Sequence, residues 1–436
     1  MRTSRKPEEE LHSMFNRVAL ALVFTLSFLA YTGSEVTASL QLVPLILFAA
    51  IVFLKVLCSD AVLRAMGSLL ELDGLLFVFL LSVFIIGPSL VSDYAKSFPV
   101  ALVLFIYLIL ARLYMAVVPI REIVEAFFWS GVLSMAIFIP MSFTALMRSV
   151  QTLERFMPFS FHPNLLAFDL AGYACVTVWK IVTGRSQEKI LAAVVGAACL
   201  VVIFFASSRG AIVGLIAGCS VAGGLMIMRT PKDRQKRLLR WGSIVGVLLL
   251  GLVLFIQNSE LFNNTFSFVD QVLQLTDSYR GVVGGFSGRF ERWNQVISMF
   301  GDGTFLIGKG LRFTDTSDST AIDNSYIVIL YETGLVSLAL ITWRFLSILR
   351  RFVKAYFNAA NPGSRALYLA LSLLLVVLLT NNIVARYLFG IGNPYSLFAF
   401  LLFATPTSKM EQWGTEPAKD SLRLMNQLYP KLQRTC

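Results

Sequence analysis

Long apolar stretches follow one another along almost the whole chain, with short polar segments between them. Each is about 15 to 22 residues long, which is enough or nearly enough for a helix to cross ~30 Å of hydrocarbon. A membrane β-barrel would instead show short segments of alternating polarity. The pattern predicts an all-α integral membrane protein with about twelve transmembrane helices. These helices are expected near residues 18–33, 40–57, 73–91, 98–118, 123–145, 164–181, 189–206, 210–228, 241–257, 323–343, 366–386 and 391–405.

The composition and the distribution of charge agree with this picture. Hydrophobic residues make up 56% of the 436 residues and charged residues 14%, far from the mix of a soluble globular domain. If the N-terminus is cytoplasmic, the cytoplasmic segments contain most of the 37 Lys and Arg residues, as the positive-inside rule requires. We expect one polytopic membrane domain over 1–436, with the N-terminus and a polar tail, 406–436, in the cytoplasm.

The net charge of +11 would suggest nucleic-acid binding in a soluble domain. Here, basic runs such as RTPKDRQKRLLR at 229–240 are interpreted as topology signals and contacts with anionic lipid. We therefore expect membrane lipids, and no nucleic acid, as partners. The first apolar run follows a basic start and resembles a secretory signal. A second span follows it at once, so we expect an uncleaved first helix.

One predicted segment outside the membrane is large: residues 258–322, between the ninth and tenth spans, on the non-cytoplasmic side. Its stretches 264–275 and 287–300 have the apolar periodicity of short amphipathic helices. In the second stretch, Ser287 fits the N-cap and Trp293 belongs to an apolar face. Glycine-rich sequence precedes this helix, so the loop is expected to act as a mobile lid.

Unusual polar groups collect at the predicted span ends on this same side. They occur in FHPN (161–164), SSRG (207–210), the loop arginines, DNSY (323–326) and NNIVARY (381–387). Because these segments share one face, we expect them to meet at the non-cytoplasmic surface of the membrane.

Arg209 stands between two apolar runs with no acidic residue nearby. A helix-terminal arginine can simply reach the lipid headgroups, but arginines at a membrane edge also face cavities and ligands, and their planar fork matches phosphate oxygens. Arg289 would lie in the first turn of its helix, where backbone N–H groups favour an anion; a solvated helix face is equally consistent. Arg292 pairs easily with Glu291 or solvent and ranks below them.

Asp323 and His162 are the candidate bases. Asp323 fits the N-cap of the tenth span, or a carboxylate that takes a proton from an incoming hydroxyl. His162 could do the same, although HPN is also a good turn before a helix. The chain has no DxD, HExxH, P-loop or GxSxG element with suitable flanks, and its five cysteines lack CxxC spacing. We expect neither a metal nor a nucleotide cofactor.

These motifs, in this order, resemble those of the bacterial O-antigen ligase and polysaccharide polymerase superfamily. The resemblance covers residues 160–345, with PN before a middle span, SSRGA between two later spans, SGRFERW and IGKGL in a large periplasmic loop, and DNSYIVILYETGLVSL opening the next span. It implies an inner-membrane enzyme whose site faces the periplasm. Such an enzyme moves a sugar chain from undecaprenyl diphosphate to an acceptor hydroxyl, on lipid A-core for ligases or on another lipid-linked repeat unit for polymerases, without metal or nucleotide.

By this resemblance, the family's two essential arginines fall on Arg209 and Arg289, which would clamp the diphosphate. The ligases' essential histidine, in an HN motif, falls on Asp323, which would act as the base, with inversion at the anomeric carbon. This departure favours a polymerase of O-antigen or exopolysaccharide. A flippase and a chain-length regulator are candidate protein partners. The expected substrate-binding residues are Arg292, Asn324, Tyr326, His162, Asn164, Arg386 and Trp293.

Two other functions stay open. A ligase that attaches the glycan to lipid A-core is the alternative within the superfamily. A transporter or flippase of lipid-linked sugars would also need an arginine-lined cavity, but it should carry polar residues through the middle of several spans, whereas here they crowd toward one face.

Overall fold

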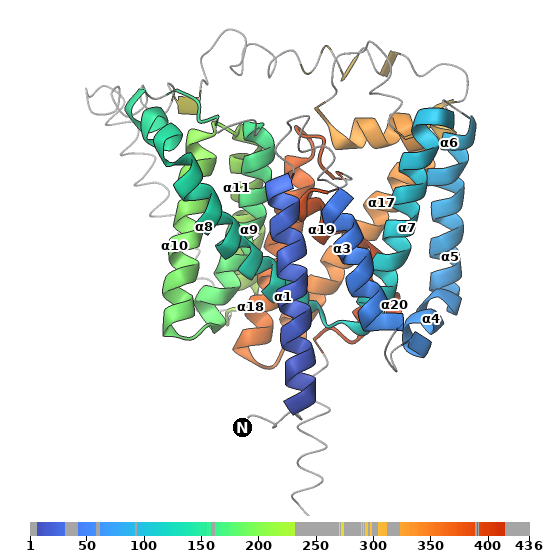
Figure 1. The fold of residues 1–436 in the computed structure, drawn as a ribbon, viewed down its shortest axis with the longest axis horizontal. Helices are drawn as coiled ribbons and strands as arrows, with labels where there is room; N and C mark the ends of the chain where they lie inside the picture. Colours follow the sequence, from blue (N-terminus) through green and yellow to red (C-terminus); the bar gives the residue numbers. More distant parts are fainter. Residues whose placement is uncertain are drawn as a thin grey trace, which may run out of the picture.

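Helices account for nearly all of the chain that the computed structural model describes. It describes residues 7–30, 42–57, 62–91, 94–152, 154–157, 162–231, 270, 272–273, 289, 291, 293–294, 297–298, 304–311, 323–388, 390 and 392–414. The helices are α1 (Pro7–Ala30), α3 (Leu42–Val52), α4 (Val62–Leu70), α5 (Leu72–Leu81), α6 (Gly87–Val91), α7 (Tyr94–Val117), α8 (Ile120–Thr152), α9 (Pro163–Thr183), α10 (Ser186–Phe205), α11 (Arg209–Arg229), α15 (Thr304–Ile307), α17 (Ser325–Asn358), α18 (Pro362–Asn381), α19 (Pro394–Ala404) and α20 (Thr407–Glu411), with π-helical turns at Phe53–Leu57 and Ser82–Ile86 (Figure 1).

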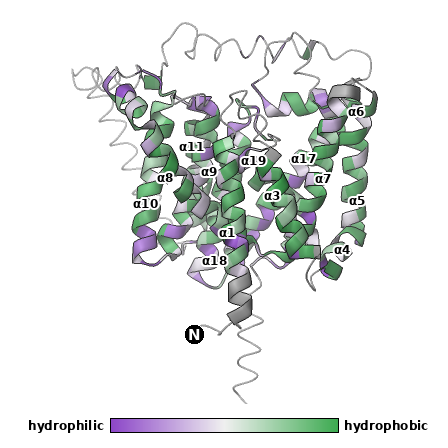
Figure 2. Ribbon diagram, viewed as in Figure 1, coloured by the Kyte–Doolittle hydropathy of each residue, from purple (hydrophilic) through white to green (hydrophobic). Residues whose placement is uncertain are grey.

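Nine helical stretches in this part of the chain are long and apolar enough to cross a membrane. They are Ser13–Ala30, Leu72–Leu90, Ser97–Val117, Ile120–Thr152, Pro163–Thr183, Ser186–Phe205, Arg209–Arg229, Ser325–Asn358 and Pro362–Asn381. Figure 2 shows hydrophobic residues along the lengths of these helices and hydrophilic ones toward their two ends. The prediction of an all-α integral membrane protein is confirmed. The predicted span 241–257 and most of the predicted loop 258–322 lie outside the described residues.

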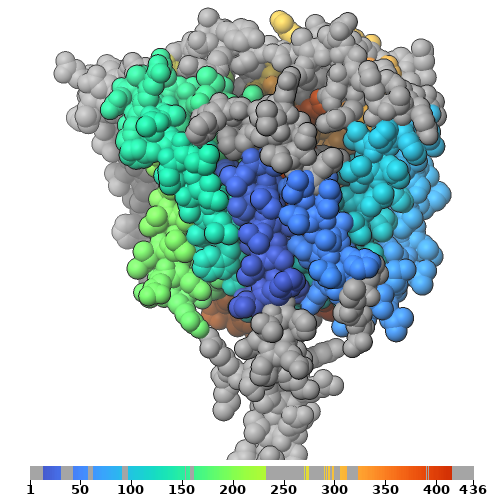
Figure 3. Space-filling model, viewed as in Figure 1, coloured from blue at the N-terminus to red at the C-terminus, as the bar shows by residue number. Residues whose placement is uncertain are grey.

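α9 is the centre of the bundle and packs against α8, α10 and α18. Small residues let aromatic rings approach it closely: a Cβ added at Gly172 would lie 2.9 Å from the ring of Tyr395. The rings of Phe168 and Tyr395 pack in a tilted arrangement with centroids 4.7 Å apart. Outside this centre, α1 packs against α8 on one side and α3 on the other (Figure 3).

α11 packs against α18 through one face of small residues. Gly210, Gly214 and Gly218 recur every fourth residue and therefore lie on one side of the helix. A Cβ at Gly218 would lie 3.1 Å from the carbonyl oxygen of Leu373, and one at Gly214 would lie 3.2 Å from that of Val377. This close approach, typical of small-xxx-small motifs in membranes, fixes the start of α11 beside the end of α18.

α17 is broken at Gly334, whose φ of 83° lies in the left-handed region. A Cβ there would collide with the carbonyl oxygen of Leu306, so the position requires glycine. The backbone N–H of Lys309 donates to the carbonyl of Tyr331 at 2.9 Å, and segment 304–311 thereby satisfies a carbonyl at the break. The predicted span 323–343 is wrong in extent, because the helix starts at Ser325 and continues to Asn358.

α19 is only 11 residues long, which corresponds to about 16 Å, roughly half the hydrocarbon thickness. All of its residues are buried. The predicted span 366–386 is wrong at its end, since α18 stops at Asn381. The residues between the two helices leave the helical path, and irregular backbone at membrane depth is tolerated where protein buries it or where it lines a cavity.

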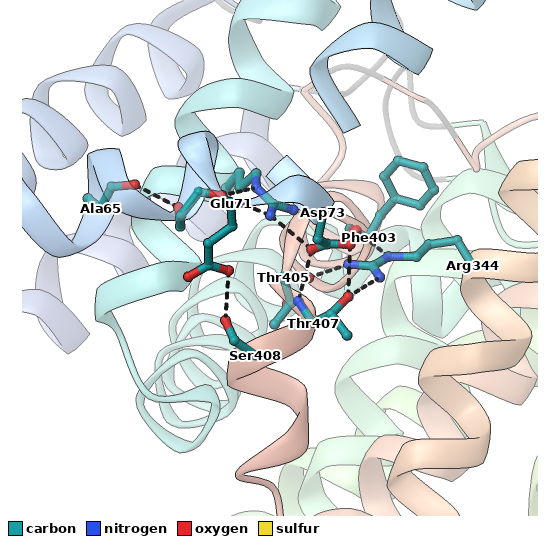
Figure 4. A network of polar contacts seen from close by, with 10 residues as sticks. Ala65, Glu71, Asp73, Arg344, Phe403, Thr405, Thr407 and Ser408 are labelled. Carbon is teal, nitrogen blue, oxygen red and sulfur yellow. Dashed lines mark hydrogen bonds and ion pairs between the residues drawn. The ribbon is translucent and has the colours of Figure 1, made fainter. Parts of the chain in front are cut away.

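A polar network joins α5, α7, α17 and the residues after α19, at the end of the bundle where α1 begins (Figures 1 and 4). Arg112, which is fully buried, donates to the carbonyl of Ser68 and to the Asp73 carboxylate, both at 2.9 Å. Asp73 also accepts from the Thr407 hydroxyl at 2.9 Å, and Arg344 donates to that hydroxyl at 3.4 Å. The first residues of the predicted tail 406–436, described as far as residue 414, are therefore part of the folded structure.

Candidate functional site

A polar pocket lies at the end of the bundle opposite the start of α1. About 30 Å³ of it is enclosed, and the rest is open to solvent. The residues that line it come from the starts of α9 and α11, the end of α18 and the predicted loop: Asn164, Ser207, Ser208, Arg209, Gly210, Arg289, Asn381, Val384 and Ala385. The structure thus brings Arg209, Arg289 and Asn164 together, as the sequence predicted.

The turn between α10 and α11 presents Arg209 as the first residue of α11. Ser207 adopts the left-handed region, with φ 54°, which lets the chain reverse direction in three residues. Ser208 occupies the N-cap, yet its side chain makes no capping hydrogen bond. The first backbone N–H groups of a 21-residue helix therefore point toward the pocket without a side-chain cap, where the helix dipole favours an anion.

Arg155 fixes this turn and was not predicted from the sequence. Its Nε donates to the carbonyl of Ala206 at 2.9 Å, and its Nη2 donates to Oδ1 of Asn164 at 2.9 Å. The only signal available was an arginine on the side of the membrane where arginines are disfavoured. Arg155 ties the start of α9 to the turn that carries Arg209.

Arg289 and Asp323 form an ion pair, with 3.4 Å between Nε and Oδ2. The arginine side chain is 15% exposed and the carboxylate 41% exposed, so the pair lies with Arg289 toward the pocket and Asp323 toward solvent. The predicted helix cap at Asp323 is wrong: Asn324 is the N-cap, and its side-chain oxygen accepts from the backbone N–H groups of Tyr326 and Ile327 at 2.9 and 3.1 Å. The Asp323 carboxylate is therefore not used for capping.

His162 occupies the N-cap position of α9, with Pro163 in the first turn, as its sequence indicated. Its Nδ1 lies 3.3 Å from the hydroxyl of Tyr387. Partial burial lowers the pKa of His162 from its ordinary 6.5, the charge of Arg155 lowers it further, that of Asp323 raises it, and that of Arg289 lowers it. His162 is therefore largely neutral at pH 7 and belongs to the same electrostatic cluster as the arginines.

The other predicted binding residues occupy different places. Tyr326 lines a separate apolar cavity of about 420 Å³ along α17, and its hydroxyl donates to the carbonyl of Leu379 at 2.7 Å. Trp293 packs against Val328 and Tyr331 of α17.

Arg386 comes directly after Ala385, which lines the pocket, and its Nη2 lies 3.4 Å from Oε1 of Glu332, which is buried in α17. Arg292 lies outside the described residues.

Asn381 and Asn382, at the end of α18, connect the site to α17. The hydroxyl of Ser325 donates to Oδ1 of Asn382 at 2.7 Å, and the backbone N–H of Tyr387 donates to the same oxygen at 3.0 Å. Asn381 lines the pocket beside Gly210. Both asparagines lie in the NNIVARY motif, but the sequence did not distinguish their roles.

Asp169 is a buried carboxylate six residues into α9 that the sequence did not single out. Its carboxylate contacts the backbone N–H of Tyr395, in the first turn of α19. A carboxylate at a helix N-terminus stabilises the helix dipole. Asp169 therefore holds the half-length helix that follows the irregular pocket-wall segment.

The pocket is suited to an anion with several oxygens, because two guanidinium groups and a helix N-terminus converge on it. Within the residues that the structure describes, no group of three or more His, Cys, Asp or Glu side chains is arranged to hold a metal ion.

Residues 193–342 match the family model described as O-Antigen ligase. The matched stretch runs from α10 into α17 and includes Arg209, Arg289 and Asp323. No curated protein matches the chain. The match supports the predicted resemblance to the O-antigen ligase and polysaccharide polymerase superfamily, and with it a membrane enzyme that acts on glycans.

Proposed function

With the O-antigen ligase match of residues 193–342 as the premise, we propose that this protein is a polysaccharide polymerase. It transfers a glycan from undecaprenyl diphosphate to the sugar hydroxyl of a lipid-linked repeat unit, at the periplasmic face of the inner membrane. The observation that carries the proposal is the convergence of Arg209 and Arg289 on one pocket, with the Asp323 carboxylate beside it.

The two arginines act on the leaving group. As the bond between the anomeric carbon and the diphosphate oxygen breaks, negative charge grows on the diphosphate. Fixed positive groups aimed at that charge lower the barrier, typically by a factor of about 10²–10³ for each donor. Arg209, Arg289 and the N-terminus of α11 supply such groups, and the protein can thereby perform this step with its own residues.

Asp323 acts on the acceptor. Its carboxylate is 41% exposed, so an acceptor sugar can reach it. The acceptor oxygen forms a bond to the anomeric carbon while its proton moves to the carboxylate, and diphosphate leaves with the electron pair of the broken bond. A single displacement of this kind inverts the anomeric configuration.

His162 and Asn164 bind sugar hydroxyls at the rim of the pocket. A neutral imidazole can accept a hydrogen bond from a hydroxyl, and the lowered pKa of His162 keeps it neutral near pH 7. Of the other predicted binding residues, Asn324 caps α17 directly after Asp323, whereas Tyr326, Trp293 and Arg386 contact other parts of the structure outside the pocket lining. We place Arg292 at this rim on the basis of the sequence alone.

The acceptor is a repeat unit because position 323 carries Asp where ligases carry His. The alternative is a ligase that attaches the glycan to lipid A-core, and the family match is compatible with both activities. A flippase that delivers the donor and a chain-length regulator are the protein partners that a polymerase would need.

The test uses the full-length protein in liposomes with an undecaprenyl-diphosphate-linked repeat unit, with and without added lipid A-core. Lipid-linked oligomers from the wild type alone, and none from Asp323→Asn, are the expected result. Transfer only to lipid A-core would replace the polymerase with the ligase. Transfer to neither acceptor would contradict the proposal and place a transporter first.

A further inference from the structure

Oγ of Ser207 and Nδ2 of Asn381 are buried polar atoms at the pocket, and neither has a hydrogen-bond partner among the described residues. Each residue is only 2% exposed, and both line the pocket that contains Arg209 and Arg289. Leaving a buried donor unsatisfied costs about 1–3 kcal/mol, so native proteins rarely do so without a reason. Here two such atoms, from separate elements, line the same cavity.

The chemistry of these atoms defines what they bind. An amide Nδ2 can only donate a hydrogen bond, and a hydroxyl can donate one. The uncapped N-terminus of α11 offers further N–H donors, because Ser208 makes no side-chain capping bond. A set of donors beside two arginines fits a ligand made of acceptor oxygens that carry negative charge.

We propose that Ser207 and Asn381 bind the diphosphate of the lipid-linked donor, together with the start of α11. This inference rests on the proposed function for the identity of the ligand. In this arrangement Arg209 and Arg289 neutralise the charge of the diphosphate. The Ser207 hydroxyl and the Asn381 amide position individual phosphate oxygens. These donors are held in place before the ligand binds, since Asn381 packs over Gly210 and the Ser207 turn is tied down through Arg155.

The close contact between α11 and Asn381 explains why position 210 is a glycine. A Cβ at Gly210 would lie 2.5 Å from Cγ2 of Val384 and 3.0 Å from Oδ1 of Asn381. Only glycine therefore allows the asparagine amide to lie against the first turn of α11. Gly210 thus brings the amide to the same place as the helix N-terminus.

The experiment titrates undecaprenyl diphosphate into the full-length protein in nanodiscs, with undecaprenol and inorganic diphosphate as the other two probes. The variants are Asn381→Asp, which replaces the N–H donor with an anion of the same shape, and Ser207→Gly, which removes the hydroxyl. A residue with φ 54° accepts glycine readily, so Ser207→Gly is expected to fold even if Asn381→Asp does not. Asn361→Ala is the matched control, because Asn361 caps the far end of α18 by accepting from the backbone N–H of Ser364 at 2.6 Å.

We expect both variants to weaken binding of undecaprenyl diphosphate and of inorganic diphosphate by about 10- to 100-fold, the value of a hydrogen bond to a charged group. Binding of undecaprenol and the apparent melting temperature should stay at wild-type values, and Asn361→Ala should bind both diphosphates normally. Loss confined to undecaprenyl diphosphate would place the two residues against the lipid chain and overturn the proposal. An unchanged Kd in both variants, or a loss matched by Asn361→Ala, would also overturn it.

Transfer kinetics separate this inference from the proposed function. If the wild type binds the diphosphates as described but transfers no glycan, the proposed function fails and the diphosphate site stands. If the wild type makes oligomers and both variants do so with an unchanged KM for the donor, the proposed function stands and this inference fails.

Discussion

The Nε atom of Arg289 lies 3.4 Å from Oδ2 of Asp323, so the pocket arginine and the proposed base are bound to one another. A diphosphate that enters the pocket competes with Asp323 for the guanidinium, because both are anions. Under the proposed function, binding of the donor would therefore weaken the ion pair and leave the carboxylate available to the acceptor hydroxyl. This order couples activation of the acceptor to occupancy of the donor site.

The Asp323→Asn variant tests this coupling. Asparagine keeps the shape but cannot take a proton, so kcat should fall by about 10²–10⁴, the usual contribution of a general base. Donor binding should be kept or improved, because Arg289 loses its competing anion. Initial rates and donor KM in liposomes measure both effects. Glu291→Gln, at an exposed position in the same region, is the control and should match the wild type; a normal kcat for Asp323→Asn would rule out the base.

His162 should make the protein less stable as the pH falls. Its pKa is lowered by partial burial and by Arg155, so the folded state binds the proton less well than the unfolded state does. The stability that neutral His162 contributes is present above its ordinary pKa of 6.5 and is lost as the pH falls through the lower, folded pKa. Apparent melting temperatures between about pH 5 and pH 8 should fall less steeply in His162→Gln than in the wild type. Equal slopes in the two proteins would contradict this, and His12→Gln provides the control.

Hydropathy located the helices around the site well, but it could not locate the features that depend on distant contacts. The predicted ends of α10 and α11 lie close to the observed ones because each helix is apolar throughout and the SSRG turn interrupts the run. Apolar residues also continue in NNIVARYLF between its two asparagines and one arginine, yet α18 stops at Asn381 because Ser325 and Asn382 take over the hydrogen bonds of the following backbone. Neither partner can be recognised from local sequence.

Some residues of the candidate site could be recognised from the sequence and others could not. Arg209 was recognisable as a charge out of place between apolar runs, and Arg289 as an arginine in the first turn of a predicted loop helix. Asp323 and Asn324 are both good capping residues, and only the structure shows that Asn324 caps the helix. Asn381 was overlooked because a polar residue at the end of a span is ordinary until its buried, unsatisfied amide is seen.

Gly218→Ala should loosen the contact between α11 and α18. The added Cβ would lie 2.7 Å from Cγ2 of Val377 and 3.1 Å from the carbonyl oxygen of Leu373, and overpacking of this kind costs about 1–3 kcal/mol. Gly223→Ala on the same helix meets no atom within 4 Å and should be neutral or slightly stabilising. The apparent melting temperature in detergent compares the two; an equal response would show that the glycine face is not needed for packing.

Asp73→Ala should destabilise the far end of the bundle. It leaves the fully buried Arg112 without its carboxylate partner at 2.9 Å, and breaking a buried pair on one side costs about 3–5 kcal/mol. Because Asp73 is 35% exposed, we expect the lower end of that range. The measurement is the apparent melting temperature. Glu71→Gln is the control, since its contact with Ser408 at 3.2 Å is exposed and should contribute little; a loss as large as that of Asp73→Ala would contradict the central role of the buried arginine.

The most direct measurement is the rate at which full-length protein releases undecaprenyl diphosphate from a lipid-linked repeat unit. We compare the wild type, Arg209→Ala and Arg121→Ala, the last altered at an exposed position at the start of α8. Loss of one group that stabilises the leaving diphosphate should slow release by at least about 10²-fold in Arg209→Ala, with normal release in Arg121→Ala. Release by Arg209→Ala at the wild-type rate would contradict the assignment of this pocket as the site of glycan transfer.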